Sequence, residues 1–256
     1  MLQAKRLDII RKNIDNAGYV DVTSLANELG ISKSTVRRDL RQLEKEEFVE
    51  LTWGGAVSLV SNGSVKEDPY QIKKESNLTE KQRLAKYASA MLQDRQSVFL
   101  DAGTSVGEMV PFINKMAPDL LVATNDIMIA KNLGDTENII LNVVGGTVRK
   151  GYYTLLGVIA ETILEELHLD IAFMSCDSLS LENGFSITNA EEVPVKRMIM
   201  SAAKRVVMLC DHSKFEKNSF MRLFNFMPSI EVVTGKELDD EIYNKYLEQN
   251  LNITRV

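Results

Sequence analysis

Six short apolar runs in the last two thirds of the chain constrain its fold more than any other feature. They read SVFLDAG, DLLVATND, NIILNVVGG, LDIAFMSCD, RVVMLCD and SIEVVTG, and each ends in a polar or glycine turn. Stretches of helical length separate them. Strands that alternate with helices pair through crossover connections, which give parallel sheets with helices on both faces. We therefore predict a mostly parallel, doubly wound α/β domain over residues 80–256.

The first 60 residues follow a different pattern, that of short helices. Apolar residues recur at three- and four-residue spacing in three groups: Leu7, Ile10 and Ile14; Val22, Leu25, Ala26 and Leu29; and Val36, Leu40 and Leu43. Gly30 is suited to end the second helix, and Ser32 to cap the third. Two short helices joined in this way form a helix-turn-helix pattern. The runs on either side of Trp53-Gly54-Gly55 predict a small hairpin, the wing of a winged helix.

The third helix is predicted to expose a basic face, since Val36, Leu40 and Leu43 turn inward. Helical geometry directs the other side to solvent, with Asp39 as the single acid there. Arginine can hold guanine through two hydrogen bonds, and Ser or Thr near a helix N-terminus can hold a phosphate. The alternative is a solvated charged face with local ion pairs. The candidate DNA contacts are Lys33, Ser34, Thr35, Arg37, Arg38 and Arg41.

Charge and cysteine content exclude several classes of protein. The net charge of -6 argues against a protein that coats nucleic acid, but residues 1–57 hold nine basic and nine acidic side chains and are neutral. No signal peptide or membrane-spanning run is present in the sequence, so a cytoplasmic location is expected. Two cysteines and two histidines without ligand spacing predict neither a disulfide framework nor a zinc site, and no cofactor is expected.

Residues 61–79 are rich in Gly, Pro, Ser and charged side chains, which is typical of a surface linker. We therefore predict a winged helix-turn-helix domain over residues 1–60, a linker over 61–79 and the α/β domain over 80–256. In open α/β sheets, ligands bind beyond the carboxyl ends of the strands. There, Gly103-Thr104-Ser105 offers backbone N–H groups and hydroxyls suited to a phosphate. Nearby lysines, Arg149 and the acids after the strands favour a small phosphorylated polyol.

The stretch VDVTSLANELGISKSTVRRDLRQLE followed by GGA is similar to the N-terminal domain of DeoR-family bacterial transcription regulators. The family's core pattern, S-x-x-T-[IV]-R-R-D-L, is matched by Ser32, Thr35, Val36, Arg37, Arg38, Asp39 and Leu40. Glu47, Leu51 and Trp53 depart from the family's usual wing residues.

The second part resembles the DeoR-family sensor domain through FLDAGTS, TND, VVGG with Arg149, LDIAF, NGFSIT, Glu192 with Lys196, and DHSKF. The resemblance implies a fold similar to ribose-5-phosphate isomerase and a sugar-phosphate effector that releases the regulator from its operator. The effector contacts that it implies are Asp101, Gly103, Thr104, Ser105, Thr124, Asn125, Gly146, Arg149, Asp177, Lys196 and Lys214. Ser175 and Ser178 replace glycines of the family pattern, so they are expected to fill space that is normally open.

The leading hypothesis is therefore a DNA-binding repressor, and not an enzyme. A dimer or tetramer is expected, because two recognition helices must reach half-sites about one helical turn apart. One alternative is an isomerase-like enzyme, with Asp101, Asp177 or Glu192 as base beside Lys196. Another is a protein-interaction module whose helix-turn-helix never meets DNA.

Overall fold

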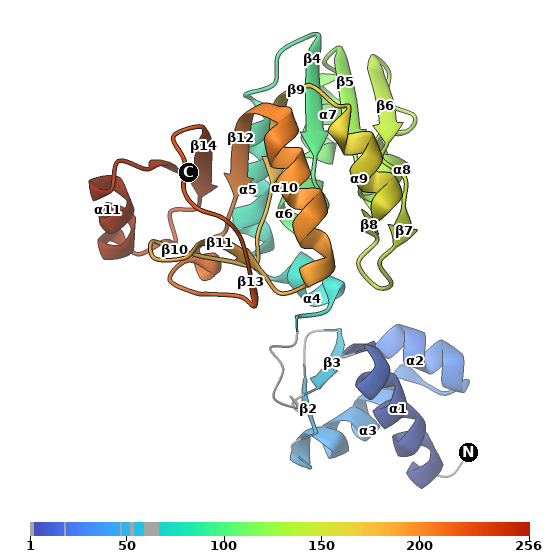
Figure 1. Cartoon of the computed structure of the whole chain (residues 1–256). Helices are drawn as coiled ribbons and strands as arrows, with labels where there is room; N and C mark the ends of the chain where they lie inside the picture. Colours follow the sequence, from blue (N-terminus) through green and yellow to red (C-terminus); the bar gives the residue numbers. More distant parts are fainter. Residues whose placement is uncertain (1–2, 18, 47, 52–53, 59–66) are drawn as a thin grey trace. The chain divides into compact units, whose positions relative to one another are not determined.

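The computed structural model describes residues 3–17, 19–46, 48–51, 54–58 and 67–256, which fall into two compact units (Figure 1). Unit 1 spans Met1–Pro69 and unit 2 spans Tyr70–Val256. The second half of the predicted linker differs from expectation, because residues 70–79 contain α4 (Tyr70–Glu75) and the start of α5 (Leu78–Ser89). The first part of that linker, residues 61–66, and the wing residues Glu47 and Trp53 lie outside the described residues.

Unit 1 contains three helices and a small antiparallel sheet in the order β1-β3-β2. Its elements are α1 (Gln3–Ala17), β1 (Tyr19–Asp21), α2 (Val22–Leu29), α3 (Lys33–Lys45), β2 (Val49–Leu51) and β3 (Gly55–Ser58). Strands β2 and β3 form the predicted hairpin. Strand β1 adds a third partner that no sequence pattern indicated.

Local chemistry sets the helix boundaries of unit 1. Gly30 ends α2 with a φ of 62°, a left-handed conformation that favours glycine. The Ser32 hydroxyl then accepts a hydrogen bond from the Thr35 N–H at 3.2 Å and caps α3. The three predicted apolar stripes meet in one core, which confirms the helix-turn-helix prediction: Ile10, Ile14, Val22, Leu25, Ala26, Val36, Leu40 and Leu43 are buried.

Unit 2 is built on a seven-stranded sheet in the order β15-β14-β12-β9-β4-β5-β6, and every described pairing within it is parallel. The strands are β4 (Gln96–Leu100), β5 (Leu120–Thr124), β6 (Ile139–Val143), β9 (Leu169–Met174), β12 (Ala203–Leu209), β14 (Ile230–Thr234) and β15 (Asn252–Arg255). The first six correspond to the six apolar runs.

Two apolar cores, one on each face of the sheet, confirm the doubly wound arrangement. One face is covered by α5, α6 (Thr104–Gly107), α7 (Val110–Met116) and α8 (Ile127–Leu133). The other is covered by α9 (Val158–Glu165), α10 (Val193–Ala202), α11 (Asp240–Glu248) and a small antiparallel sheet of β10 (Ser178–Ser180), β11 (Gly184–Ile187) and β13 (Met221–Phe224). A short hairpin, β7 (Thr147–Val148) and β8 (Leu155–Leu156), precedes α9. No helix among the described residues is long and apolar enough to cross a bilayer.

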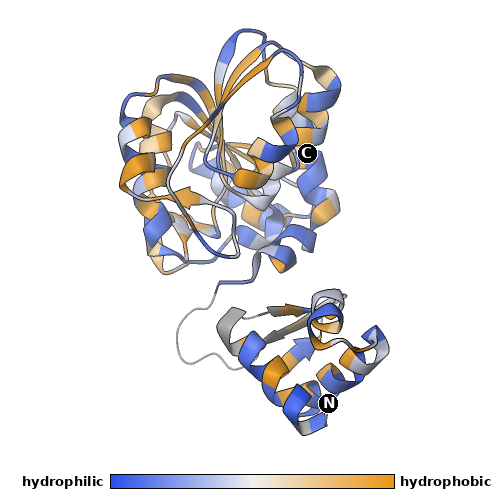
Figure 2. Cartoon of the chain, turned by 90° about the vertical axis from the view of Figure 1, so that its right-hand side faces the viewer, coloured by the Kyte–Doolittle hydropathy of each residue, from blue (hydrophilic) through white to orange (hydrophobic). Residues whose placement is uncertain are grey.

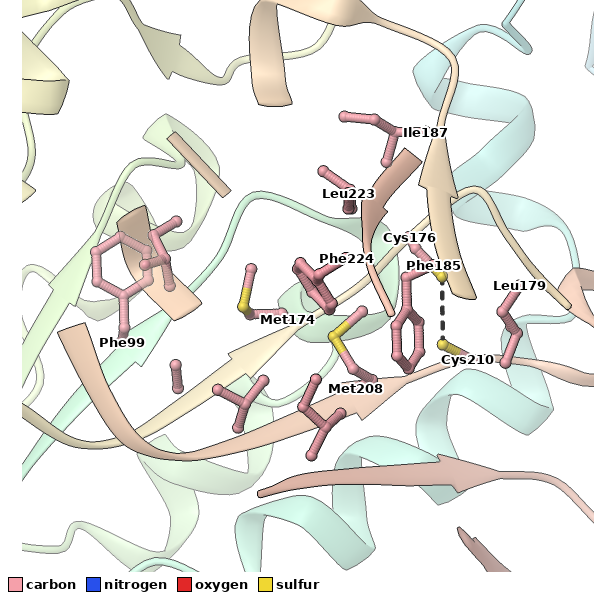
Figure 3. Packing of buried hydrophobic residues seen from close by; sticks show 14 of the residues in the cluster. Phe99, Met174, Cys176, Leu179, Phe185, Ile187, Met208, Cys210, Leu223 and Phe224 are labelled. Atoms are coloured by element: carbon pink, nitrogen blue, oxygen red, sulfur yellow. Dashed lines mark hydrogen bonds between the residues drawn. The ribbon is translucent and has the colours of Figure 1, made fainter. Parts of the chain in front are cut away.

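Figure 3 shows the second of these cores, where side chains of β9, β11, β12 and β13 pack together. Cys176 and Cys210 are both buried in it, as expected for free thiols, with their sulfur atoms 3.6 Å apart. Burial and the neighbouring Cys176 thiol raise the pKa of Cys210 well above its ordinary value, with Cys176 the larger cause. These cysteines therefore act as apolar core residues.

The prediction that Asp39 is exposed on the basic face of α3 is wrong, because the Asp39 side chain is buried. It lies three residues after Val36 and four before Leu43, on the inner side of the helix. The Arg6 guanidinium of α1 holds it bidentately, with Nε–Oδ2 and Nη2–Oδ1 distances of 2.7 and 3.1 Å. A buried carboxylate needs such a partner, and Arg6 provides it.

Replacing Asp39 with Ala would remove the carboxylate against which the Arg6 guanidinium packs. We expect the free energy of unfolding to fall by clearly more than the ~0.5 kcal/mol typical of surface substitutions. Glu44→Ala, an exposed acid on the same helix, is the matched control. Urea titration of the full chain followed by circular dichroism checks this; equal midpoints for the two variants would show that the ion pair does not stabilise unit 1.

Candidate functional site

Helix α3 presents a basic surface in unit 1. Lys33, Arg37, Arg38 and Arg41 are exposed, and with Asp39 turned inward no acid interrupts them. Ser34 is also exposed, whereas Thr35 is half-buried. Both hydroxyls lie within hydrogen-bond distance of Ser32 Oγ, at 2.8 and 2.9 Å, so they take part in the cap of the helix.

The direction in which strands are added to the sheet of unit 2 reverses between β4 and β9. From β4 the chain adds β5 and β6 on one side, whereas from β9 it adds β12, β14 and β15 on the other. Adjacent parallel strands whose connections diverge leave a crevice at their carboxyl ends. Asp101 follows β4 and Asp177 lies three residues after β9, so the fold brings both acids to this crevice.

Two buried charges of unit 2 form an ion pair here. Lys196 of α10 donates to Asp101 Oδ2 and, at 3.3 Å, to the Ser175 carbonyl oxygen. Burial disfavours the charged ammonium, but Asp101 and Glu192 outweigh it and raise the pKa of Lys196, so it stays protonated. Asp101 Oδ1 is buried with no hydrogen-bond partner among the described residues, an arrangement typical of functional sites.

Two further ion pairs border the crevice. Lys73 of α4 donates to Asp177 at 2.5 Å, and the Thr188 N–H donates to the same carboxylate at 2.8 Å. Burial raises the pKa of Asp177, but Lys73 and the Thr188 N–H outweigh it and hold the pKa at about 2. Arg149 contacts Glu192 at 2.5 Å and stacks on the Tyr152 ring, 3.7 Å from its centroid.

Lys81 lies beside the predicted phosphate loop. Its Nζ and the Thr104 hydroxyl both donate to the Lys73 carbonyl oxygen, so the two groups are neighbours. Burial lowers the pKa of Lys81 to about 8. Lys214, half-buried beyond β12, lies close enough to lower the pKa values of both Lys81 and Asp177. Lys81 therefore lies near Thr104, and Lys73 and Lys214 lie near Asp177.

Several predicted contact residues have structural roles instead of open positions. Thr124 is buried and its hydroxyl donates to the Leu100 carbonyl oxygen at 2.7 Å. The Asn125 side chain accepts from the Ala102 N–H at 3.1 Å and holds the loop after β4. Ser105 is buried too. Gly146 has a φ of 151° and backs closely onto Leu156, so it shapes the hairpin next to Arg149.

Ser175 and Ser178 fill space as expected. A Cβ atom built on Gly103 would lie 2.0 Å from Ser175 Oγ, so this hydroxyl occupies the room beside the phosphate loop. The Ser178 hydroxyl lies 2.8 Å from that of Ser219. His212 is held by Glu80 at 2.7 Å through its Nδ1, which explains its position without a ligand.

Lys73 was missed because its segment has the composition of a linker, and Lys81 because it lies at the edge of that segment, before the predicted strand ends. One signal could have found Lys81: it lies three and four residues before Leu84 and Ala85, on the same buried face of α5. No comparable pattern marks Lys73.

Known proteins resemble both units. The DeoR-like helix-turn-helix domain matches residues 6–62, and the DeoR C terminal sensor domain matches residues 76–236. The chain is 33% identical over 239 residues to the HTH-type transcriptional regulator GlpR of Haloferax volcanii, across 93% of this chain and 92% of that protein. It is 28% identical to the HTH-type transcriptional regulator IolR of Bacillus subtilis, across 97% of both. Ribose 5-phosphate isomerase A from Methanocaldococcus jannaschii aligns over 55% of each chain, with a TM-score of 0.40 and 18% identity.

The two matched domains account for most of the chain, and its sequence relatives are named as regulators over nearly their whole length. The chain therefore belongs to the DeoR family and is a transcriptional regulator, not an enzyme.

Proposed function

We propose that this regulator is a repressor that occupies operator DNA through α3 and is released when a phosphorylated sugar binds at the β4–β9 crevice. A protein bound at an operator excludes other proteins from that DNA, so its release restores access. The effector would act by stabilising a state of the protein with lower affinity for DNA.

The basic surface of α3 supports the DNA-binding part of this proposal. We assign the DNA contacts to Lys33, Ser34, Thr35, Arg37, Arg38 and Arg41. Arginines on an exposed helix face suit guanine edges and phosphates, and a capped N-terminus suits a backbone phosphate. The neutral charge balance of residues 1–57 does not weaken the assignment, because four of the nine basic side chains are exposed together on α3: Lys33, Arg37, Arg38 and Arg41.

One observation carries the effector part: Lys81 lies near Thr104 of the glycine-hydroxyl loop, and Lys73 and Lys214 lie near the half-buried Asp177. Ammonium groups and backbone N–H groups suit a phosphate, and carboxylates accept hydrogen bonds from sugar hydroxyls. We assign effector contacts to Asp101, Gly103, Thr104, Arg149, Asp177, Lys196 and Lys214, and add Lys73 and Lys81. Ser105, Thr124, Asn125 and Gly146 support the loops.

A thermal-shift screen of phosphorylated sugars, with their dephosphorylated forms as controls, tests the effector class. A ligand that binds the native state raises the melting temperature. We expect a phosphorylated sugar to do so and to release the protein from its operator in a mobility-shift assay. Stabilisation by the dephosphorylated sugar alone would contradict the proposal.

Arg37→Ala and Arg38→Ala test the DNA-binding helix. Removal of an arginine that reads a base is expected to cost about 1–3 kcal/mol of operator-binding free energy. Removal of an arginine that binds a phosphate is expected to reduce the salt dependence of operator binding. Fluorescence anisotropy at one salt concentration gives the first quantity, and a series of salt concentrations gives the second. Lys131→Ala, an exposed cation of unit 2, is the control. Wild-type affinity in both arginine variants would reject α3 as the recognition helix.

Lys214→Ala tests the effector site without altering the DNA-binding unit. We expect effector affinity to fall at least ~10-fold, the loss of one charged contact, while operator affinity without effector stays unchanged. Lys236→Ala, an exposed lysine of the same unit, should respond as wild type. Lys214 is a sharper probe than Lys196, whose removal would leave the buried Asp101 without its ammonium. Normal release of Lys214→Ala would exclude this lysine from the site.

The lowered pKa of Lys81 gives the effector affinity a pH dependence. Below about pH 8 Lys81 is protonated and attracts a phosphate; above it the charge is lost, and affinity should fall. The phosphate itself is already a dianion well below that pH, because its second pKa is about 6. The Lys81→Arg variant keeps its charge above pH 8, so its effector affinity should not fall there. Calorimetric titrations across the alkaline range check it, and identical profiles for the two proteins would count against Lys81.

A further inference from the structure

One side of unit 2 carries a group of exposed apolar side chains around the edge strand β6. Figure 2 faces this side. The group, named here the β6–α9 surface, consists of Leu121, Ile140, Val148, Val158, Ile159 and Ile163. Ile140, Val158 and Ile159 are 67, 77 and 64% exposed. Exposed apolar residues scattered singly are ordinary, but a contiguous group is not.

Several of these side chains are neighbours. Leu121 and Ile140 are cross-strand partners on β5 and β6. Ile159 and Ile163 are one turn apart on α9, and a Cβ atom built on Gly145, just beyond β6, would lie 3.8 Å from Ile159 Cγ2. Their combined exposed area is on the order of several hundred Å², which approaches the ~800 Å² that each partner contributes to a standard protein interface.

The backbone of β6 is also available for pairing. The Asn138 carbonyl accepts from Leu120 and the Val144 N–H donates to Thr124, both towards β5. The N–H and C=O groups of successive residues point to alternate sides of a strand. Those of Ile139, Leu141 and Val143 therefore point away from β5. In the part of the chain that the structure describes, no strand pairs with this outer edge.

Natural proteins protect such edges with charged residues, prolines, bulges or a covering element. Strand β6 reads Ile139-Ile140-Leu141-Asn142-Val143 and contains neither a charge nor a proline. An unprotected apolar edge of this kind is an association site.

We propose that the β6–α9 surface is the interface with a second copy of this chain, in which the two β6 strands pair antiparallel across a twofold axis. Twofold symmetry requires the same patch on both copies and makes a self-paired strand antiparallel, so one edge strand and one flanking helix suffice. The choice of a second copy rests on the proposed function, because each chain has one DNA-reading helix and an operator with two half-sites requires two.

The interface adjoins the proposed effector site. Val148 belongs to the β6–α9 surface, and the next residue, Arg149, contacts Glu192 in the crevice. The hairpin of β7 and β8 therefore carries both a residue of the interface and a residue of the site. Effector contacts to Arg149 act on the same hairpin that meets the second copy.

Sedimentation analysis of the full chain over a range of concentrations, without DNA, tests the interface. We expect wild-type protein to self-associate, and Ile140→Glu and Val158→Glu to weaken association by about 100-fold or more, because charges would be buried across the axis. Both residues are largely exposed, so the variants should keep the wild-type melting temperature of the monomer. Phe220→Glu is the matched control, since Phe220 is 70% exposed but lies outside the surface.

Hydrogen exchange provides a second measurement. The amides of Ile139, Leu141 and Val143 should become protected as concentration rises, and Ile140→Glu should abolish that protection. A monomeric wild type, undiminished association of both variants, or protection independent of concentration would each overturn the proposal; the last would mean that the chain covers its own edge. A chain that associates as expected but binds no DNA would instead refute the proposed function alone.

Discussion

The buried ion pair between Asp101 and Lys196 is the interaction on which the crevice depends. Removing a charge from water costs several kcal/mol, so each of these groups is tolerated only because the other is adjacent. The pair joins the end of β4 to α10, and the Ser175 carbonyl joins the end of β9 to the same ammonium. Three segments far apart in sequence are thereby fixed around one point, and the Gly103-Thr104-Ser105 loop begins two residues after Asp101.

Unit 1 uses the same principle for another purpose. The R-R-D-L sequence of α3 would place an acid among the basic side chains if all four residues were exposed. Arg6 makes it favourable for Asp39 to face the interior, since the two charges neutralise each other there. The outer surface then presents Arg37 and Arg38 without the carboxylate of Asp39 beside them. A buried pair thus determines the sign of an exposed surface.

The sequence predicted the elements whose signal is local and apolar. The six predicted strands of unit 2 and the three helices of unit 1 follow from the pattern of apolar residues. Burial on one or both faces selects apolar residues at regular spacing. Strand β15, with the sequence Asn252-Ile253-Thr254-Arg255, has no such run and was missed. Of the predicted site residues, Asp101 and Lys196 form an ion pair, and Asp177 lies near enough to influence the pKa of Lys196. Their role as effector contacts stays a prediction. Lys73 was not found, since a polar helix at the edge of a domain has the composition of a linker, and Lys81 was not found because it precedes the strand ends where ligand contacts were expected.

The ion pairs of the crevice also indicate how a ligand could act on the protein. Asp177 already has Lys73 as its partner, so an anion entering the crevice must share or replace that carboxylate. Lys73 belongs to α4, the first helix of unit 2, which begins directly after Pro69 at the boundary between the units. A phosphate that takes the Lys73 ammonium from Asp177 changes the contacts of the element into which the connection from unit 1 runs. Under the proposed function, exchange of this ion-pair partner would therefore alter the contacts of the helix that follows the connection from unit 1.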